Sequence, residues 1–208
     1  MTKILVTGGT GFIGSYLVNE LAQIKKNQIT VIDNNFRGKI ENIIKKKNIN
    51  FKKVDILNRP KIFDLLKKNK FDKIFHLAFI NGTKNFYNIP QKVLEIGIVG
   101  TINLMDAVNK FGVKSFFYAS TSEVYQDADH YPTKESVVCK VPDVTNPRYS
   151  YGSSKILGEV LTFHYLTKSK KKFVFRPHNV YGPKMGWDHV IPEVLKKIYK
   201  ASNKLKKK

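Results

Sequence analysis

The sequence predicts an α/β fold in which a doubly wound parallel sheet carries helices on both of its faces. Short apolar runs rich in β-branched residues alternate along the chain with segments whose apolar residues recur at helical spacing. A glycine-rich stretch joins the first run, Lys3 to Val6, to the first helical pattern, Phe12 to Ile24. Runs of this kind suit strands that are buried on both sides of a sheet.

The glycine-rich stretch, Thr7 to Gly14, has the features of a phosphate-binding turn. Glycines at a strand-to-helix joint allow a tight turn and let the backbone approach a pyrophosphate, which then faces the free amides of the new helix. The spacing Gly8, Gly11, Gly14 is one residue wider at its start than the standard dinucleotide fingerprint. An ordinary glycine-rich turn is the alternative, and a Rossmann-type dinucleotide-binding unit is the interpretation that the flanking strand and helix favour.

Length and composition exclude several classes of protein. A chain of 208 residues with 42% hydrophobic residues can form one sizeable core, or one domain and part of another. No run is long and apolar enough to cross a membrane, and the sequence opens on a strand pattern rather than a signal peptide, which predicts a cytoplasmic protein. Cys139 is the only cysteine and the five histidines lack ligand-like spacing, which argues against disulfides and against a metal site.

The net charge of +21 raises the question of nucleic-acid binding, since 37 basic residues stand against 16 acidic ones. The lysines are spread over segments where helices should face water, among them 45–47, 67–70 and 168–172. No basic stripe interleaved with aromatic residues accompanies them. We therefore do not expect nucleic acid to be the main partner.

The second predicted strand, Ile29 to Asp33, ends in an acidic residue about 20 positions beyond the glycines. In a dinucleotide-binding unit, an acid at this place accepts hydrogen bonds from the adenosine ribose and repels a 2′-phosphate. Asp33 therefore favours NAD over NADP, although Arg37 lies close by and opposes that preference. A strand-end turn is the alternative explanation of Asp33.

The remaining elements follow in the order expected for a parallel sheet. Strands are predicted at 51–54, 73–78 and 115–119, a helix begins near Pro60, and a long buried helix spans 90–111. The segment 81–90 is predicted to be a loop. His76 ends the fourth strand, where a hydrogen-bonded core histidine is favoured over a cofactor contact.

Side chains suited to chemistry gather after the fifth strand. Ser120 to Tyr125 places hydroxyls and a carboxylate at one strand end, and Tyr151 and Lys155 share one face of a helix. Lowering a tyrosine pKa by ~3 units, so that it can act as a base, requires roughly 4 kcal/mol of phenolate stabilisation. A lysine one turn away, together with the charge of a nicotinamide, can supply it. Alone, however, the same spacing is common in helices without any such role.

Together these motifs resemble the extended short-chain dehydrogenases/reductases that act on nucleotide-diphosphate sugars, and the resemblance covers almost the whole chain. Several ordered motifs are more specific than any single one. They are Thr7 to Gly14, Asp33-Asn34 with Gly38, His76 to Ala78, Gly100-Thr101 with Asn103-Leu104, Ser120 to Tyr125, Tyr151 to Lys155 with Glu159, and Arg176 to Pro183.

The resemblance implies roles for individual positions. The residues implied to hold NAD are Gly8, Gly11, Phe12, Ile13 and Gly14 at the pyrophosphate, Asp33, Asn34, Asp55 and Ile56 around the adenosine, and Leu77 and Ala78 along the channel. Thr121, Tyr151 and Lys155 are implied to form the catalytic trio, of which Tyr151 and Lys155 also contact the cofactor. The remaining implied groups are Glu123 as a base, and Ser122 and Asn179 as substrate contacts with Thr121.

The implied reaction is oxidation at C4 of the sugar, which gives a 4-keto intermediate. Tyr151 takes the hydroxyl proton while hydride passes to the nicotinamide, Lys155 lowers the pKa of Tyr151, and Thr121 holds the sugar oxygen. An epimerase then returns the hydride to the other face, a decarboxylase releases carbon dioxide, and a dehydratase removes water.

Two motifs bear on the choice among these branches. Thr121-Ser122-Glu123 resembles the triplet of UDP-glucuronate decarboxylases and GDP-mannose dehydratases, whereas dTDP-glucose dehydratases carry an aspartate where Ser122 stands. Asp33 to Lys39 resembles NAD-using epimerases and decarboxylases. We rank epimerase first, decarboxylase second and dehydratase third.

The chain also departs from the family pattern. Gly97 stands where many relatives have asparagine, Gln126 stands where glycine is usual, and relatives continue past residue 208 into a lobe that closes over the sugar. We predict a dinucleotide-binding domain at 1–183 and the start of a substrate lobe with a basic tail at 184–208, with a homodimer as the candidate assembly. The alternative is a truncated dinucleotide-binding protein that turns over little sugar.

Overall fold

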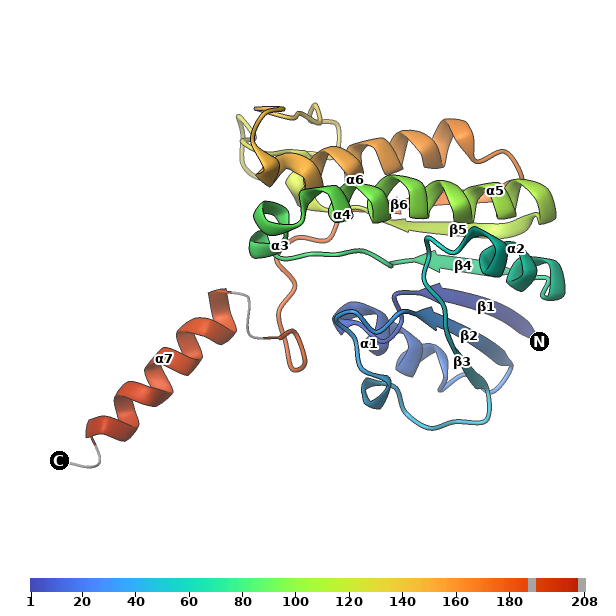
Figure 1. Cartoon of the computed structure of the whole chain (residues 1–208), viewed down its shortest axis with the longest axis horizontal. Helices are drawn as coiled ribbons and strands as arrows, with labels where there is room; N and C mark the ends of the chain where they lie inside the picture. The colour runs from blue at the N-terminus through green and yellow to red at the C-terminus, as the bar shows by residue number, and fades with distance from the viewer. Residues whose placement is uncertain (187–189, 206–208) are drawn as a thin grey trace. The chain divides into compact units, whose positions relative to one another are not determined.

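The computed structural model describes residues 1–186 and 190–205 of the chain. Residues cluster into two compact units, Met1–His178 and Asn179–Lys208. The first unit contains a parallel sheet in the order β3-β2-β1-β4-β5-β6 (Figure 1). Its strands are β1 Thr2–Thr7, β2 Asn27–Asp33, β3 Ile49–Lys53, β4 Lys73–His76, β5 Val113–Ala119 and β6 Ser169–Phe175. The strand order reverses between β1 and β4, where open α/β sheets bind their ligands.

Helices cover both faces of the sheet, as the sequence predicts. They are α1 Phe12–Leu21, α2 Arg59–Lys68, α3 Thr83–Asn88, α4 Pro90–Leu94, α5 Thr101–Phe111 and α6 Ser150–Val160, followed by α7 Val190–Leu205 in the second unit. Ile4 and Val6 of β1 pack in the core with α1, whereas Leu5 between them packs in a larger core with α2, α5 and α6. Because successive side chains of a strand point to opposite faces, this alternation places α1 on one face and the other three helices on the opposite face.

The long helix predicted at 90–111 is interrupted. Between α4 and α5, the backbone forms a π-helical segment, Glu95–Gly100, so the helical path continues with one wider turn. Such π-helical turns inside α-helices are frequent at functional sites. A second π-helical segment, Leu161–Tyr165, extends α6.

Two predictions from the sequence are wrong at the level of secondary structure. The segment 81–90, predicted to be a loop, contains the short helix α3, which is held in place by the fully buried Phe86. The lysines at 168–172 do not lie on a water-facing helix, because most of them belong to β6. β6 is an edge strand, and lysines there hinder unwanted pairing with another chain.

His76 is a satisfied core histidine. Thr101 Oγ1 donates to the carbonyl of Gly97 at 2.7 Å, so it accepts from His76 Nε2 at 3.0 Å. On the other side, Thr7 Oγ1 accepts from the amide of Ala78 at 3.1 Å and lies 2.7 Å from His76 Nδ1, to which it donates. Burial, together with the charge of Lys155, lowers the pKa of His76 to about 3. The ring is therefore neutral and ties β1 and β4 to the π-helical segment.

Helix α6 lies close against β5 because Gly158 has no side chain. A Cβ at Gly158 would overlap the hydroxyl of Tyr118, which is buried and has no hydrogen-bond partner among the described residues. We expect Gly158→Ala to lower the free energy of unfolding by about 2 kcal/mol, as overpacking does. Tyr118→Phe removes the unpaired hydroxyl, so it should cost nothing by itself and should relieve most of the Gly158→Ala loss. Urea unfolding of the two single variants and the double variant measures this, and strictly additive losses would contradict it.

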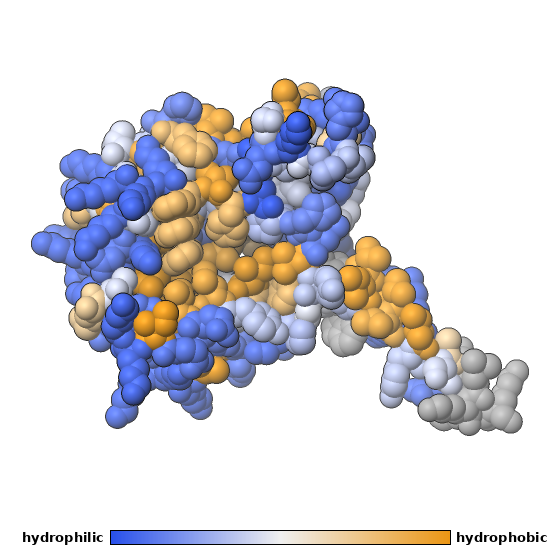
Figure 2. Space-filling model, turned by 180° about the vertical axis from the view of Figure 1, so that it is seen from behind, coloured by the Kyte–Doolittle hydropathy of each residue, from blue (hydrophilic) through white to orange (hydrophobic). Residues whose placement is uncertain are grey.

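Aromatic rings continue across the α1 face of the sheet. Phe117 stacks on Phe75 with a centroid distance of 4.4 Å and on Phe173 at 4.6 Å, and Phe173 is 43% exposed. Figure 2, drawn from behind, shows apolar surface in orange between hydrophilic regions in blue.

Within the described residues, no helix combines the length and apolarity needed to span a bilayer.

The second unit consists of an irregular segment and the amphipathic helix α7. Ile191, Leu195 and Ile198 are exposed on α7, where Lys197 and Glu193 form an ion pair at 3.0 Å. The lysines predicted to form a solvated tail, 206–208, lie outside the described residues. The unit boundary after His178 precedes residue 183, and the assignment of these units to a cofactor domain and a substrate lobe stays a prediction.

Candidate functional site

The glycine turn forms a closely packed cradle between β1 and α1. Gly8 has a left-handed backbone with φ of +69°, and a Cβ there would lie 2.7 Å from the backbone of Ala78. A Cβ at Gly14 would overlap the carbonyl oxygen of Gly8. Helix α1 starts after Gly11 without any side-chain cap and without an acidic residue in its first turn. The amides of Phe12, Ile13 and Gly14 therefore open the helix at an uncapped, electropositive end.

A hydrogen-bonded cluster follows at the ends of β2 and β3. Asp33 accepts from the amide of Thr10 at 3.1 Å and from that of Asn35 at 2.8 Å, which holds the half-buried carboxylate against the glycine turn. Asn34 Nδ2 donates to Asp55 at 2.9 Å, and Ile56 is buried beside it. The residues predicted to surround an adenosine thus lie together at one sheet edge. Arg37 reaches away from Asp33 to the carbonyl of Asn81.

The predicted catalytic side chains also meet. Thr121 follows β5, Tyr151 and Lys155 project from α6, and the Thr121 hydroxyl lies close enough to the Tyr151 phenol to lower its pKa. Lys155 Nζ donates to the carbonyl of Ala119 at 2.7 Å. All three side chains are buried. They lie at the same sheet edge as Ala78, which contacts the glycine turn.

The electrostatic environment of Tyr151 differs from the expectation. The pKa of Tyr151 is raised to about 12, mainly by burial; the nearby Thr121 hydroxyl opposes this shift, and the Glu123 carboxylate adds to it. Lys155 Nζ lies 5.9 Å from the Tyr151 ring centroid, and burial lowers the pKa of Lys155 to about 7. The proximity of Lys155 is therefore not sufficient to create a phenolate in the protein alone.

Ser122 and Glu123 begin the turn that follows Thr121. The Ser122 amide donates to the Pro177 carbonyl at 2.9 Å, and Glu123 pairs with Arg148 at 3.6 Å. Burial raises the pKa of the Glu123 carboxyl, and Arg148 partly opposes that shift. Gln126 ends the turn with a left-handed φ of +50°, which explains why glycine suits this position.

A buried ion pair under this turn has no role in the sequence-based prediction. Arg176, at the end of β6, donates to both carboxylate oxygens of Glu159 at 2.9 and 2.6 Å. Glu159 also accepts from Ser120, and Arg176 donates to the Tyr125 hydroxyl at 2.7 Å. The motifs Tyr151 to Glu159 and Arg176 to Pro183 contain both residues, but only the fold places them side by side.

Two aromatic residues at the site were also not anticipated. Phe86 of α3 stacks on Tyr151 with a centroid distance of 4.9 Å, and Phe79 meets the same ring edge-on at 5.1 Å. Lys155 Nζ lies 4.0 Å from the centroid of Phe79. The sequence predicts a loop for the segment that contains Phe86, so it does not indicate a buried aromatic side chain there. Gly97, which packs against Phe79, was the available signal.

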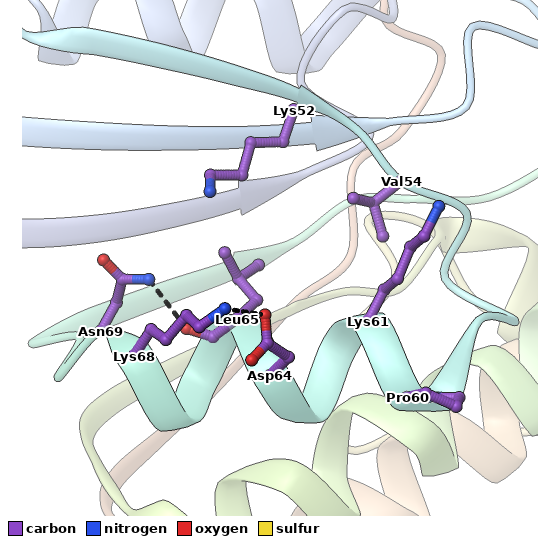
Figure 3. A pocket seen from close by; sticks show the side chains of 8 residues that line it. All are labelled: Lys52, Val54, Pro60, Lys61, Asp64, Leu65, Lys68 and Asn69. Carbon is purple, nitrogen blue, oxygen red and sulfur yellow. Dashed lines mark hydrogen bonds and ion pairs between the residues drawn. The ribbon is translucent and has the colours of Figure 1, made fainter.

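The remaining predicted residues lie apart from this cluster or outside the first unit. Leu77 and Ala78 follow β4, next to the glycine turn, as expected for a channel. Asn179 begins the second unit and is exposed. A separate pocket between β3 and α2 contains none of the predicted site residues (Figure 3); it is lined by Lys52, Val54, Pro60, Lys61, Asp64, Leu65, Lys68 and Asn69.

The cradle fits a dinucleotide on structural grounds. Side chains are excluded at Gly8 and Gly14 by the backbone itself, and the uncapped start of α1 offers amides to an anion. The carboxylate of Asp33 is held beside this turn, where ribose hydroxyls are bound in such folds. Among the described residues, no group of three or more acidic, histidine or cysteine side chains could hold a metal ion.

Comparison with known proteins agrees with this geometry. Residues 4–207 match the model of the NAD dependent epimerase/dehydratase family. The chain is 32% identical over 204 residues to a dTDP-D-glucose 4,6-dehydratase of Dictyostelium discoideum, covering 93% of this chain and 47% of that protein. It is 34% identical to UDP-glucuronic acid decarboxylase 3 of Arabidopsis thaliana, covering 89% of this chain and 53% of the relative.

Solved structures give the same result. The UDP-glucose 4-epimerase of Thermotoga maritima, solved with UDP-glucose, superposes with a TM-score of 0.81 at 29% identity, covering 91% of this chain and 60% of that one. The chain thus spans about half the length of the curated relatives it matches. With a family match across nearly its entire length, the chain belongs to the NAD dependent epimerase/dehydratase family.

Proposed function

We propose that this chain is the cofactor-binding and proton-transferring part of an NAD-dependent enzyme that oxidises a nucleotide-diphosphate sugar at C4. One continuous series of contacts carries the proposal. Gly8 packs on Ala78. Phe79, the residue after Ala78, contacts Tyr151 and Lys155, and the Thr121 hydroxyl lies near the Tyr151 phenol. A dinucleotide cradle and an acid–base group are thus adjacent, as a redox site requires.

The residues proposed to hold NAD are those of the cradle and of the β2 and β3 ends. Gly8, Gly11, Phe12, Ile13 and Gly14 would face the pyrophosphate; Asp33, Asn34, Asp55 and Ile56 would face the adenosine; Leu77 and Ala78 would line the channel. Asp33 supports NAD over NADP, because its carboxylate would repel a 2′-phosphate.

When bound, NAD supplies the hydride acceptor. In the proposed chemistry, Tyr151 removes the proton from the C4 hydroxyl as the C4–H bond yields its hydride, so that a ketone forms. Thr121, whose hydroxyl lies near the Tyr151 phenol, would hold the sugar oxygen beside it. Lys155 contributes positive charge that favours the phenolate, and this must offset the burial that raises the pKa of Tyr151 to about 12.

The fate of the ketone separates the branches, and we retain epimerase or dehydratase chemistry with UDP-glucuronate-type decarboxylation as the alternative. Glu123 would be the additional base, with Ser122 and Asn179 as sugar contacts. The raised pKa of the Glu123 carboxyl supports a proton-transfer role. A dinucleotide-binding chain with little turnover is the second candidate, and the raised pKa of Tyr151, which disfavours the phenolate, is the observation that favours it.

The test uses the 208-residue chain itself. NAD binding is measured by calorimetry, and the complex is then mixed with UDP-glucose, UDP-glucuronate, GDP-mannose and dTDP-glucose. Transient absorbance at about 340 nm and a new sugar product are expected from at least one of them. NAD binding without either signal would reject the catalytic proposal in favour of the binding protein.

Gly14→Ala should weaken NAD binding at least ~100-fold, since the added methyl overlaps the Gly8 carbonyl and the cradle must open. Gly152→Ala is the control outside the cradle, because its Cβ would lie 3.1 Å from the flexible end of the Gln126 side chain, which can move aside. Calorimetry with NAD distinguishes the two. Equal NAD affinities of Gly14→Ala and the wild type would refute the proposal that NAD binds at the glycine cradle.

We further propose a homodimer formed through α4 and α6. Apolar side chains are exposed on the outer surface of these helices and of the segment between α4 and α5: Leu94 36%, Val99 48%, Leu157 38% and Val160 49%. On a chain of net charge +21, an apolar stripe of this kind is suited to burial by a second copy.

Val160→Lys should shift the chain from dimer to monomer in sedimentation velocity, because it would place a charge in a self-complementary contact. Tyr87→Lys is the control, since Tyr87 is also 50% exposed but lies on α3. A monomeric wild type, or a dimer unaffected by Val160→Lys, would contradict the proposal that the chain dimerises through this surface.

A cytoplasmic location stays a prediction, supported by the single cysteine of the sequence.

A further inference from the structure

The ammonium group of Lys155 is surrounded mainly by aromatic rings. Its hydrogen bond is to the Ala119 carbonyl, and ring centroids lie around it at 4.0 Å for Phe79, 5.1 Å for Tyr118 and 5.9 Å for Tyr151. Phe79 is the closest of the three and the one without a titratable group. A ring face at this distance attracts a cation, and the attraction is stronger where water is excluded.

Phe79 contacts both members of the proposed acid–base pair. Its ring meets Tyr151 edge-to-face, with an interplanar angle of 80°, while its face receives the Lys155 ammonium. Phe86 also contacts Tyr151, by parallel stacking, but among the described rings those near the Lys155 ammonium are Phe79, Tyr118 and Tyr151. Phe79 is therefore the side chain that joins the two residues.

The place of the Phe79 ring depends on Gly97. A Cβ at Gly97 would lie 2.7 Å from Cε2 and 2.8 Å from Cζ of Phe79, and 2.9 Å from Cβ of Ser154. Gly97 is buried in the π-helical segment, where its carbonyl accepts from Thr101, so the backbone is not free to move aside. Any other residue at 97 would displace the ring from Lys155.

We propose that Phe79 is a positioning residue for Lys155 and Tyr151, and that Gly97 is the position that makes room for its ring. This inference rests on the function proposed above for Tyr151 and Lys155. Phe79 stabilises the charged form of Lys155 in a site where burial disfavours it. The other titratable groups facing Lys155 are His76 from β4, Tyr118 from β5, and Tyr151 and Glu159 from α6.

The first test is independent of activity. Gly97→Ala should lower the urea midpoint, and Phe79→Leu in the same chain should restore part of it, because leucine lacks the Cε2 and Cζ atoms that would clash. Strictly additive effects of the two substitutions would overturn the spatial pairing.

The second test measures Lys155 itself. The pH dependence of acetylation by acetic anhydride, followed by mass spectrometry of the peptide that contains Lys155, gives its pKa. Phe79→Leu keeps the site apolar but removes the ring, so the pKa should fall by about 0.5 to 1 unit. Phe86→Leu is the matched control and should leave the value unchanged. An unchanged or higher pKa in Phe79→Leu would overturn the inference.

The third test applies to turnover with NAD and the accepted sugar nucleotide. Phe79→Leu should lower kcat about tenfold with little change in KM, because the pair is misplaced while the substrate contacts remain. Wild-type turnover by Phe79→Leu would overturn the positioning role. If the unaltered chain transfers no hydride, the proposed function fails, while the urea cycle and the pKa of Lys155 still decide this inference.

Discussion

Tyr151→Phe should reduce hydride transfer from the sugar by at least ~1,000-fold while leaving NAD affinity within about twofold, because only the proton acceptor is lost. The substitution removes one oxygen from a ring that Phe79 and Phe86 hold on two sides, so the ring itself should not move. Stopped-flow absorbance at about 340 nm after mixing enzyme, NAD and sugar nucleotide reports the step.

The pH dependence gives a second criterion. Burial raises the pKa of Tyr151 to about 12, so the phenolate is the minor form at neutral pH and its population grows as the pH rises. Wild-type kcat/KM should therefore increase with pH from about pH 6 and level off above about pH 7, where Lys155 loses the charge that favours the phenolate, and the residual activity of Tyr151→Phe should lack that rise. Thr121→Val is the companion variant, since it removes the hydroxyl near the Tyr151 phenol that lowers its pKa. Turnover by Tyr151→Phe at the wild-type rate would exclude Tyr151 as the base.

The parts of the fold that the sequence predicts are those where local pattern and tertiary packing agree. β1, β2 and β5 are buried, apolar and β-branched or aromatic, and the glycine turn has few other conformations open to it. β6 lacks that signal, because its run of lysines on an edge strand has the composition of an exposed helix. Its pairing with β5 decides its structure, and pairing of residues distant in sequence is not a local property.

The candidate site also contains residues that local sequence patterns predict and residues that only tertiary packing places. The positions of Gly8, Asp33 and Tyr151 follow from motif spacing, since each lies at the start or end of an element whose orientation is set by the parallel sheet, and Lys155 follows Tyr151 by one helical turn. Phe79 could not be placed, because its role depends on a π-helical segment and on the absence of a side chain at Gly97. The raised pKa of Tyr151 could not be predicted either, because it arises from burial by residues far apart in the chain.

Arg176→Met should cost roughly 3 kcal/mol of unfolding free energy, the largest loss of stability we expect from one substitution. The pair it breaks is well shielded, with side-chain exposures of 22% for Arg176 and 10% for Glu159. Removing the guanidinium leaves a carboxylate in the interior with Ser120 as its remaining partner, and also removes the donor to Tyr125. Urea unfolding of the chain, with fluorescence or circular dichroism, measures the loss.

Two comparisons establish whether the loss comes from an isolated buried charge. Lys68→Met breaks the pair with Asp64, whose side chains are 69% and 55% exposed, and should cost no more than about 0.5 kcal/mol. Arg176→Met combined with Glu159→Leu removes both charges and should recover most of the stability, because two apolar side chains of similar volume fill the space of the ion pair. The double variant should nevertheless lose hydride transfer, since Ser120 and Tyr125, which flank Thr121, would no longer be anchored to α6 and β6. If the double variant were as unstable as Arg176→Met alone, packing of the arginine side chain rather than its charge would hold this end of the sheet together.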